Sequence, residues 1–496
     1  MSDEIDETTA LLRQDEENRS ISPEPESGEG LKTESGKSVA GILSVLLIVW
    51  LTKIGVFISQ ADVFLVLTTY SQISSEFHAL KDGGWLLTAY LLAQSVAQPL
   101  YGKLSDIFGR KRCLQMSYVF FALGTLCSSL AQSMPQIIAS RALEGCGGAG
   151  MVCMVSILLT DLVPLHKVAV YRSYVNLVQT VGRSCGAVIG GYIAHGIGWR
   201  WGFFIQFPIV LIGLVATELK LHLQTDIQRQ AESSSSIRQK LKRIDFVGAF
   251  FLSFTILSGL IFFHLIRQEY ELRDPIVLVS IGVSLVSSTA FALVEQFYAT
   301  EPIFPLRLLS HTAVLSAYTT LSMQTIAIIS MTFVAPLYFQ VVDGVNPAEA
   351  GFYLLPGPIG NTVGGLFAGW WIGKTFRYKL PLVIGAVCST AAFVCLMLLW
   401  RGHNSLLDAA LILPVGFATG IAHSGSFIGL TAQIDTEDIA IAGSGLYLFS
   451  NIGMMAGISI GNTVYQMSLG PGLQAALKDV PDKKEVRTVE TVDNTK

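Results

Sequence analysis

The chain has 496 residues, of which 51% are hydrophobic and only 14% are charged, and its formal net charge is -4 at pH 7. Soluble domains carry about 25% charged residues, so this composition excludes an ordinary soluble enzyme and indicates a membrane protein with many spans. The charges are spread over loops rather than gathered in a basic patch, so they give no indication of a nucleic-acid partner.

The N-terminal segment, residues 1–38, is acidic and rich in Ser, Glu and Pro, and it lacks the basic start and apolar core of a signal peptide. We expect this segment to be disordered and cytosolic. Within it, Glu7, Leu11 and Leu12 fit the pattern E-x-x-x-L-L, which resembles acidic dileucine signals that direct fungal cargo to the vacuole through a sorting adaptor. An accidental match in an acidic tail is the alternative.

Apolar stretches of about 20 residues, long enough to cross the hydrocarbon core, recur through most of the chain. Each is predicted to be a helix, because a backbone exposed to lipid must satisfy its hydrogen bonds within its own segment. Basic residues, Arg172 among them, gather in the loops on one side, which predicts a cytosolic N-terminus. The thirteen predicted spans are residues 41–70, 84–104, 113–131, 136–162, 170–194, 202–219, 246–266, 275–297, 313–341, 349–372, 380–400, 406–430 and 439–467.

The first span contains Asp62, in the stretch FISQADVFLVLTTYSQISSEF. A charge at bilayer depth costs about 2.5 to 3.5 kcal/mol on insertion scales, so it requires a function or a partner. We interpret Asp62 as a proton-binding or cation-binding residue. One half of a fixed structural ion pair is the alternative.

The run GKLSDIFGRKR, residues 102–112, connects the second and third spans. Gly102 and Gly109 permit a tight loop, and Asp106 offers a carboxylate to a helix N-terminus. Arg110 and Lys111 hold the loop on the cytosolic side. A loop that only obeys the positive-inside bias needs neither the Asp nor the paired glycines, so this spacing indicates a specific role.

Arg141 and Glu144 lie three residues apart in the fourth span, in SRALEGCGGAGM, and therefore share one helix face. Because arginine does not lose its proton, a buried Arg141 must meet a carboxylate, and the spacing makes Glu144 one candidate. An internal ion pair without a role in transport is the alternative.

The fifth span places Gly182, Gly186 and Gly190 on one helix face, with Gly191 next in the chain. Four-residue spacing of small residues predicts close contact with another helix. Generic packing of membrane helices explains these glycines equally well.

Arg183 adds a second cation to the same span, and Gln179 and Asn176 lie one and two turns before it. These residues predict a polar stripe along a cavity. In the C-terminal half, Asn361, His423 and Asn451 are weaker candidates for the same cavity, because polar side chains in a bundle more often hold helices together.

Residues 220–245 contain a serine run and a basic cluster, and they are predicted to form a cytosolic linker. No loop is long enough for a catalytic domain, and no motif with the spacing of a metal, nucleotide or other cofactor site is present. The sequence therefore indicates no enzyme, and transport driven against a gradient would depend on ions such as protons.

The run at residues 102–112 closely resembles G-x-L-[AS]-D-x-x-G-R-[KR], the loop between helices 2 and 3 of the major facilitator superfamily. The stretches around Asp62, Arg141 and Gly186 resemble motifs of its fourteen-helix drug:proton antiporter branch, although Ala187 stands where that branch commonly has Pro. The phrases TAYLLAQSVAQPLYGKLSDIFGRKR and LLTDLVPLHKVAVYRSYVNLVQTVGRS are similar in particular to fungal vacuolar basic amino acid transporters.

The resemblance implies an all-α major facilitator fold with a cavity that opens to either side in turn. Two six-helix bundles, residues 39–219 and 298–467, would flank two inserted helices at 246–297, and Asp106 would face the N-terminus of the thirteenth span in a gate. It also makes Asp62 a second candidate partner of Arg141. The polar tail at 468–496 stands where relatives usually have a last helix, which leaves about thirteen spans.

We therefore expect proton-coupled antiport of basic amino acids from the cytosol into the fungal vacuole, with no cofactor. Asp62 and Glu144 would attract the cationic substrate or carry the proton, and Arg141 would tune their protonation. Efflux of drugs or secondary metabolites at the plasma membrane is the first alternative. A nutrient receptor that does not transport is an alternative of another class.

Overall fold

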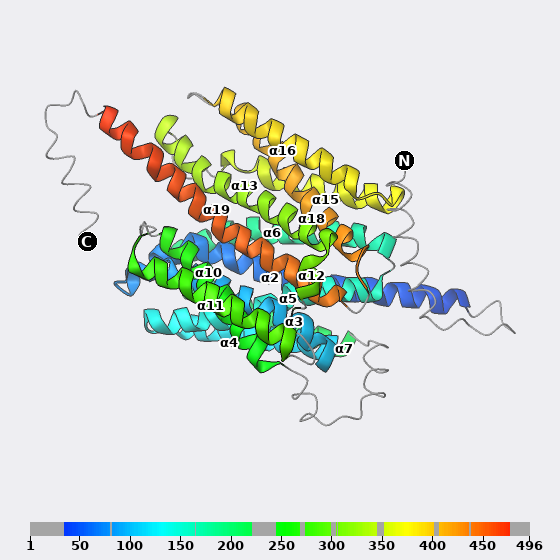
Figure 1. The fold of residues 1–496 in the computed structure, drawn as a ribbon. Helices are drawn as coiled ribbons and strands as arrows, with labels where there is room; N and C mark the ends of the chain where they lie inside the picture. Colours follow the sequence, from blue (N-terminus) through cyan, green and yellow to red (C-terminus); the bar gives the residue numbers. More distant parts are fainter. Residues whose placement is uncertain are drawn as a thin grey trace.

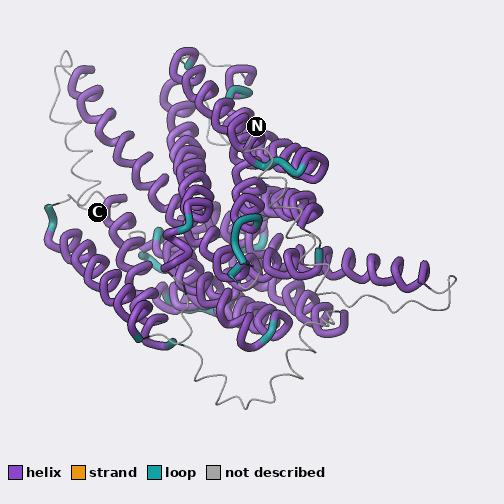
Figure 2. The backbone as a smooth tube through the Cα atoms, turned by 45° about the vertical axis from the view of Figure 1, so that its right-hand side comes forward, coloured by secondary structure: helices purple, strands orange, loops and turns teal. Residues whose placement is uncertain are grey.

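The computed structural model describes residues 34–79, 82–163, 165–220, 245–267, 273–298, 304, 306–344, 352–400, 406–435 and 438–476. Helices make up nearly all of this part of the chain, and Figure 2 shows no strand in it. The predicted all-α fold is confirmed. The dileucine residues Glu7, Leu11 and Leu12 lie outside the described residues, as does most of the predicted linker.

Thirteen helices in the described residues have 20 residues or more, and nine of them contain a stretch long and apolar enough to cross a membrane. Two short helices, α12 (Leu306–Ser310) and α17 (Leu406–Ala409), precede α13 and α18. The long helices are α2 (Glu34–Glu76), α3 (Trp85–Phe108), α4 (Arg110–Leu130), α5 (Met134–Leu162), α6 (Leu165–Gly196), α7 (Trp199–Lys220), α10 (Phe246–Arg267), α11 (Pro275–Phe297), α13 (Thr312–Val342), α15 (Pro356–Thr375), α16 (Lys379–Leu399), α18 (Ile412–Thr431) and α19 (Ile439–Ala476).

The long helices form two bundles. In the first, α2 packs on α6, α3 on α5, and α4 on α5 and α7; in the second, α15 and α16 pack on α18, and α13 packs on α19. Figure 1 shows α13, α15, α16 and α18 gathered on one side of the molecule and α3, α4 and α7 on the other. The bundles meet where α6 contacts α15 and where α3 contacts α19, while α10 pairs with α11 and lies against α3 and α19.

The observed helices follow the predicted spans closely except at the two ends of the described chain. Helix α2 begins at Glu34, inside the segment 1–38 that was expected to be disordered, and α19 continues to Ala476, inside the polar tail predicted from residue 468. Hydropathy marks where lipid contact ends, whereas a helix ends where its backbone hydrogen bonding stops. Polar turns therefore extend both helices beyond their apolar stretches.

The glycine face of α6 lies against α2. A Cβ on Gly186 would overlap the carbonyl oxygen of Ala61, and Gly182 and Gly190 also lie in close contact with α2. Gly191 differs, because nothing lies within 4 Å of its Cβ position. The prediction that Gly191 packs against a helix is wrong, since one residue turns the helix by about 100° away from the α2 contact.

We expect Gly186→Ala to lower the stability of the folded protein by about 1–3 kcal/mol, because the added methyl group meets backbone that cannot move aside. Gly191→Ala, in the same helix but facing open space, should stay within about 0.5 kcal/mol of the wild type. The midpoint of thermal unfolding in detergent, monitored by gel filtration, measures the stability of both variants. Equal midpoints for the two would contradict this packing.

Candidate functional site

A cavity of about 330 Å³ lies between the two bundles, a size typical of sites for small molecules. Side chains from α2, α3, α5 and α6 line one side, and side chains from α13, α18 and α19 line the other. Among the described residues that line it, Arg183 is the one permanent charge and none is acidic. Much of the wall is apolar, and its amides and some of its hydroxyls belong to Gln60, Gln94, Gln98, Gln179, Ser450 and Asn451.

Arg183 is held in place by a neutral neighbour. Its Nε donates a hydrogen bond to Oε1 of Gln60 at 2.8 Å, and none of the ion pairs among the described residues includes Arg183. Gln179, one turn earlier on α6, also lines the cavity. The guanidinium is therefore a fixed positive charge that an anionic group in the cavity can meet.

Asn176, the third residue of the predicted stripe, does not line this cavity. Its Nδ2 donates to Oδ1 of Asn361 at 2.7 Å, which joins α6 of the first bundle to α15 of the second. Of the weaker candidates, His423 and Asn451 do line the cavity. The predicted stripe is thus divided between the cavity and the interface of the bundles.

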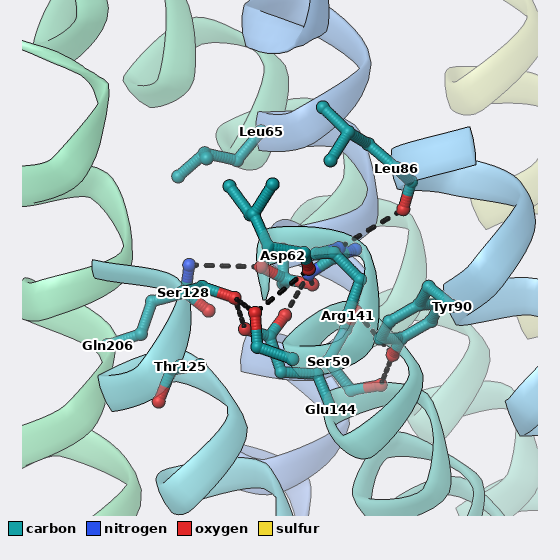
Figure 3. A network of polar contacts seen from close by, with 12 residues as sticks. Ser59, Asp62, Leu65, Leu86, Tyr90, Thr125, Ser128, Arg141, Glu144 and Gln206 are labelled. Carbon is teal, nitrogen blue, oxygen red and sulfur yellow. Dashed lines mark hydrogen bonds and ion pairs between the residues drawn. The ribbon is translucent and has the colours of Figure 1, made fainter. Parts of the chain in front are cut away.

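Arg141 lies at the centre of a charged cluster with Asp62 and Glu144, shown in Figure 3. Its Nη1 donates to Oδ2 of Asp62 at 2.5 Å and to Oε2 of Glu144, and its Nε donates to the carbonyl oxygen of Leu86 at 3.3 Å. All three charged side chains are 0% exposed. Two carboxylates face one guanidinium, so the fully ionised cluster has one negative charge in excess, and one proton makes it neutral.

Neutral groups complete the cluster. Ser128 on α4 donates to Oε1 of Glu144 at 2.6 Å, and Gln206 on α7 donates to Oδ1 of Asp62 at 3.2 Å. The guanidinium of Arg141 also lies over the ring of Tyr90, 4.6 Å from its centre. The sequence patterns above do not single out these three residues. A lone amide in the apolar stretch around Gln206 is the signal that points to one of them.

The cluster lies behind the wall of the cavity. Asp62, Arg141 and Glu144 do not line it, whereas Gln60 and Val63, on either side of Asp62 in α2, do. Helix α2 therefore turns Asp62 away from the cavity and toward α5. A small molecule in the cavity therefore touches neither carboxylate in this structure.

Arg110 joins the run at 102–112 to the end of α5. It donates to Oδ1 of Asp106 at 2.5 Å and to Oδ2 of Asp161 at 2.9 Å. Gly102 packs against the first turns of α19, where a Cβ would lie 2.7 Å from Oγ of Ser444. Gly102 thus makes a contact with the thirteenth long helix, and Asp106 forms an ion pair with Arg110. That Asp106 faces the N-terminus of this helix stays a prediction.

The same end of the molecule carries the other basic residues of this run. Lys111 lies 3.3 Å from a carboxylate oxygen of Glu218 at the end of α7, while Gly109 adopts a φ of 93° between α3 and α4. The positive-inside bias predicts that this end is cytosolic. Arg172, which was expected in a cytosolic loop, is only 5% exposed, because α6 already begins at Leu165 and takes Arg172 into the bundle.

At the opposite end, Glu76 closes the contact between α2 and α7. It accepts hydrogen bonds from Arg200 at 2.5 Å and from Nε1 of Trp199 at 2.6 Å. The hydrogen bond from Arg200 lowers the pKa of Glu76 below its ordinary value of 4.5, although partial burial acts in the opposite direction. Trp199 and Arg200 thus hold α2 and α7 together at the end opposite the predicted cytosolic end.

This contact predicts how stability depends on pH. Because the folded protein holds the pKa of Glu76 below its unfolded value, the contact stabilises above about pH 4.5, and its contribution is lost as the pH falls through the lowered pKa. Arg200→Gln removes the cation and keeps the carboxyl group, so the pKa of Glu76 in the folded protein moves toward its unfolded value and the loss of stability in acid should become smaller. Unfolding midpoints measured between neutral and acidic pH test this, and parallel profiles for the two proteins would contradict it.

Comparisons with known proteins agree with this architecture. The family model described as "Major Facilitator Superfamily" matches residues 53–458. The chain is 30% identical over 460 residues to the Vacuolar membrane amino acid uptake transporter fnx2 of Schizosaccharomyces pombe, covering 92% of this chain and 77% of that protein. It is 30% identical over 410 residues to the Vacuolar basic amino acid transporter 2 of Saccharomyces cerevisiae, covering 81% and 86%.

The chain is also similar to a relative named for drug resistance and to a solved transporter structure. The Multidrug resistance protein fnx1 of S. pombe is 30% identical over 436 residues, covering 87% of this chain and 81% of that protein. The proton:xylose symporter XylE has the same fold with a TM-score of 0.59 and 15% identity, covering 88% of this chain and 91% of that chain. The family match covers most of the chain and the helices form two bundles around a cavity, so the chain belongs to the Major Facilitator Superfamily and is a transporter.

Proposed function

We propose that this protein is a proton-coupled antiporter that moves amino acids, basic ones included, from the cytosol into the vacuole. The observation that carries the proposal is the buried cluster of Asp62, Arg141 and Glu144, with one negative charge in excess, behind a cavity that holds one fixed cation. The names of the relatives fnx2 and Vacuolar basic amino acid transporter 2 support the choice of substrate and membrane.

The cavity offers partners for the α-carboxylate and the α-ammonium group that every amino acid carries. Arg183 would pair with the α-carboxylate of the substrate, and the amide oxygens of the glutamines would accept hydrogen bonds from its ammonium group. No described lining residue offers a carboxylate to a basic side chain. Such a side chain would instead meet the rings of Phe64, Phe333 and Tyr447, whose faces attract cations.

Proton binding and substrate binding are linked through shared helices. Helix α2 carries both Asp62 and the lining residue Gln60, and α5 carries Arg141 and the lining residue Val152. A proton that neutralises the cluster removes its excess charge and changes how tightly α2 and α5 are held together. If this change favours the state that is open to one side, the protein binds substrate and proton in turn. Proton binding then changes the affinity for the substrate, and substrate binding changes the affinity for the proton by the same factor.

Uptake into vesicles of purified protein tests the proposal. With an acidic interior, labelled arginine, lysine and a neutral amino acid should accumulate, and a protonophore should abolish the accumulation. Uptake that is unchanged by the pH difference would reject the coupling, and absence of amino acid uptake would reject the substrate.

Efflux of apolar cations or other drugs is the second candidate function. The apolar wall contains Phe64, Phe333, Met454 and Met455, which adapt to varied shapes, and the relative fnx1 is named a multidrug resistance protein. A fluorescent tag separates the two candidates, because a signal at the vacuolar membrane supports amino acid storage and a signal at the cell surface supports efflux.

A further inference from the structure

Arg172 is a buried cation whose partners in the described chain are all neutral. It is 5% exposed, and its Nη1 donates to the hydroxyl of Tyr447 at 2.6 Å and to the hydroxyl of Ser156. Its guanidinium lies over the ring of Phe427, 3.9 Å from the centre. None of the ion pairs found among the described residues includes Arg172.

Two of these three partners belong to the opposite bundle. Ser156 is on α5, in the same bundle as Arg172, whereas Phe427 is on α18 and Tyr447 is on α19. Arg172 therefore closes the space between the bundles on the side of the cavity that faces the predicted cytosolic end. Nearby, a Cβ on Gly369 of α15 would lie 2.7 Å from Oγ of Ser173, so the bundles touch at this level along α6.

Movement of the bundles apart at the cytosolic end would take Phe427 and Tyr447 away from Arg172. The guanidinium would then face an open, water-filled entrance with only Ser156 beside it. A cation at membrane depth without a counter-ion is costly, and an anion that enters from the cytosol would lower this cost. Arg172 would thus have neutral partners in the closed state and a charge without a counter-ion in the open state.

Arg172 also continues the polar stripe of α6. Residues 172, 176, 179 and 183 follow the spacing of one helix face, and 11 residues separate the two arginines, about 16.5 Å along the axis. Gln179 lies between them and lines the cavity that Arg183 also lines. One helix face therefore presents a cation at the cytosolic gate and a second cation in the central cavity.

We propose that Arg172 is an entry site for the carboxylate of the substrate, occupied when the cytosolic gate is open, and that Arg183 holds the same carboxylate after the gate closes. Closure returns the rings of Phe427 and Tyr447 to Arg172, which replaces its anionic partner and releases the carboxylate toward Arg183. This proposal depends on the proposed function for its substrate, an amino acid taken from the cytosol.

The test uses sidedness and a matched pair of substrates. Arginine and agmatine differ only in the carboxylate, and vesicles sorted by access to an N-terminal tag expose one face of the protein. Arg172→Gln should raise the KM for arginine offered to the cytosolic face by about tenfold or more, the loss expected for a hydrogen bond to a charged group. The KM for agmatine, and for arginine offered to the luminal face, should change by less than about twofold.

Two further variants separate binding from gating. Arg172→Lys keeps the charge and should retain part of the preference for arginine over agmatine, which also controls for loss of folding in Arg172→Gln. Tyr447→Phe weakens the gate and keeps the cation, so it should alter both substrates equally. Equal shifts for arginine and agmatine in Arg172→Gln would overturn the entry site and leave a gate alone. A wild-type protein that carries no amino acid would instead defeat the proposed function.

Discussion

We expect replacement of Asp62 by Asn to remove most of the amino acid uptake that a pH gradient drives and to leave the protein folded. The change removes one carboxylate and leaves Arg141 paired with Glu144, a neutral pair that no longer needs a proton. The amide oxygen of the new side chain can still accept the hydrogen bond from Gln206. We expect the stimulation of uptake by an acidic interior to fall by about 5- to 150-fold, the range of one coupling free energy.

Exchange of labelled for unlabelled substrate without a pH difference is the control for this variant. It requires the cavity and the movement of the bundles but no net proton transfer, so it should persist in Asp62→Asn. Glu144→Gln removes the other carboxylate and gives the same charge count. Loss of coupling in both variants indicates a shared proton, loss in one alone identifies the carrier, and full coupling in both would reject the cluster as the proton site.

The fold was largely predictable because a bilayer allows few solutions. Apolar stretches must be helices, their length is fixed by the hydrocarbon thickness, and glycines at four-residue spacing mark helix contacts. The predicted range 275–297 matches α11 (Pro275–Phe297) for this reason. The helix ends at Glu34 and Ala476 were not predicted, because a helix can continue into water beyond its apolar stretch.

The site was predictable in its residues and not in its arrangement. The cost of burying charge pointed to Asp62, Arg141, Glu144 and Arg183, and the ion pair of Arg141 with both acids follows the sequence prediction. The rotation of α2 and α6 about their axes and the packing of the second bundle decide which of these residues reaches the cavity. No local sequence pattern encodes this rotation or this packing. Arg172 was assigned to a loop for a related reason, since it stands near the boundary of an apolar stretch.

Arg183→Gln is the variant that should change substrate selection most. The guanidinium is the one permanent charge among the described residues of the cavity wall, and it donates a hydrogen bond to Gln60. Without it, the α-carboxylate has no counter-ion there, and the KM for arginine should rise by about 10- to 150-fold. Agmatine, which has no carboxylate, should be carried at least as well as by the wild type, because a like charge has been removed from the cavity.

The ratio of arginine to agmatine uptake therefore distinguishes recognition from damage. A variant with a distorted cavity loses both substrates together, whereas loss of the carboxylate partner moves the ratio in one direction only. Gln60→Ala serves as the matched control, because it releases Arg183 without removing the charge and should lower the ratio less. If Arg183→Gln reduces arginine and agmatine by the same factor, Arg183 supports the structure of α6 and the cavity binds its substrate through neutral groups.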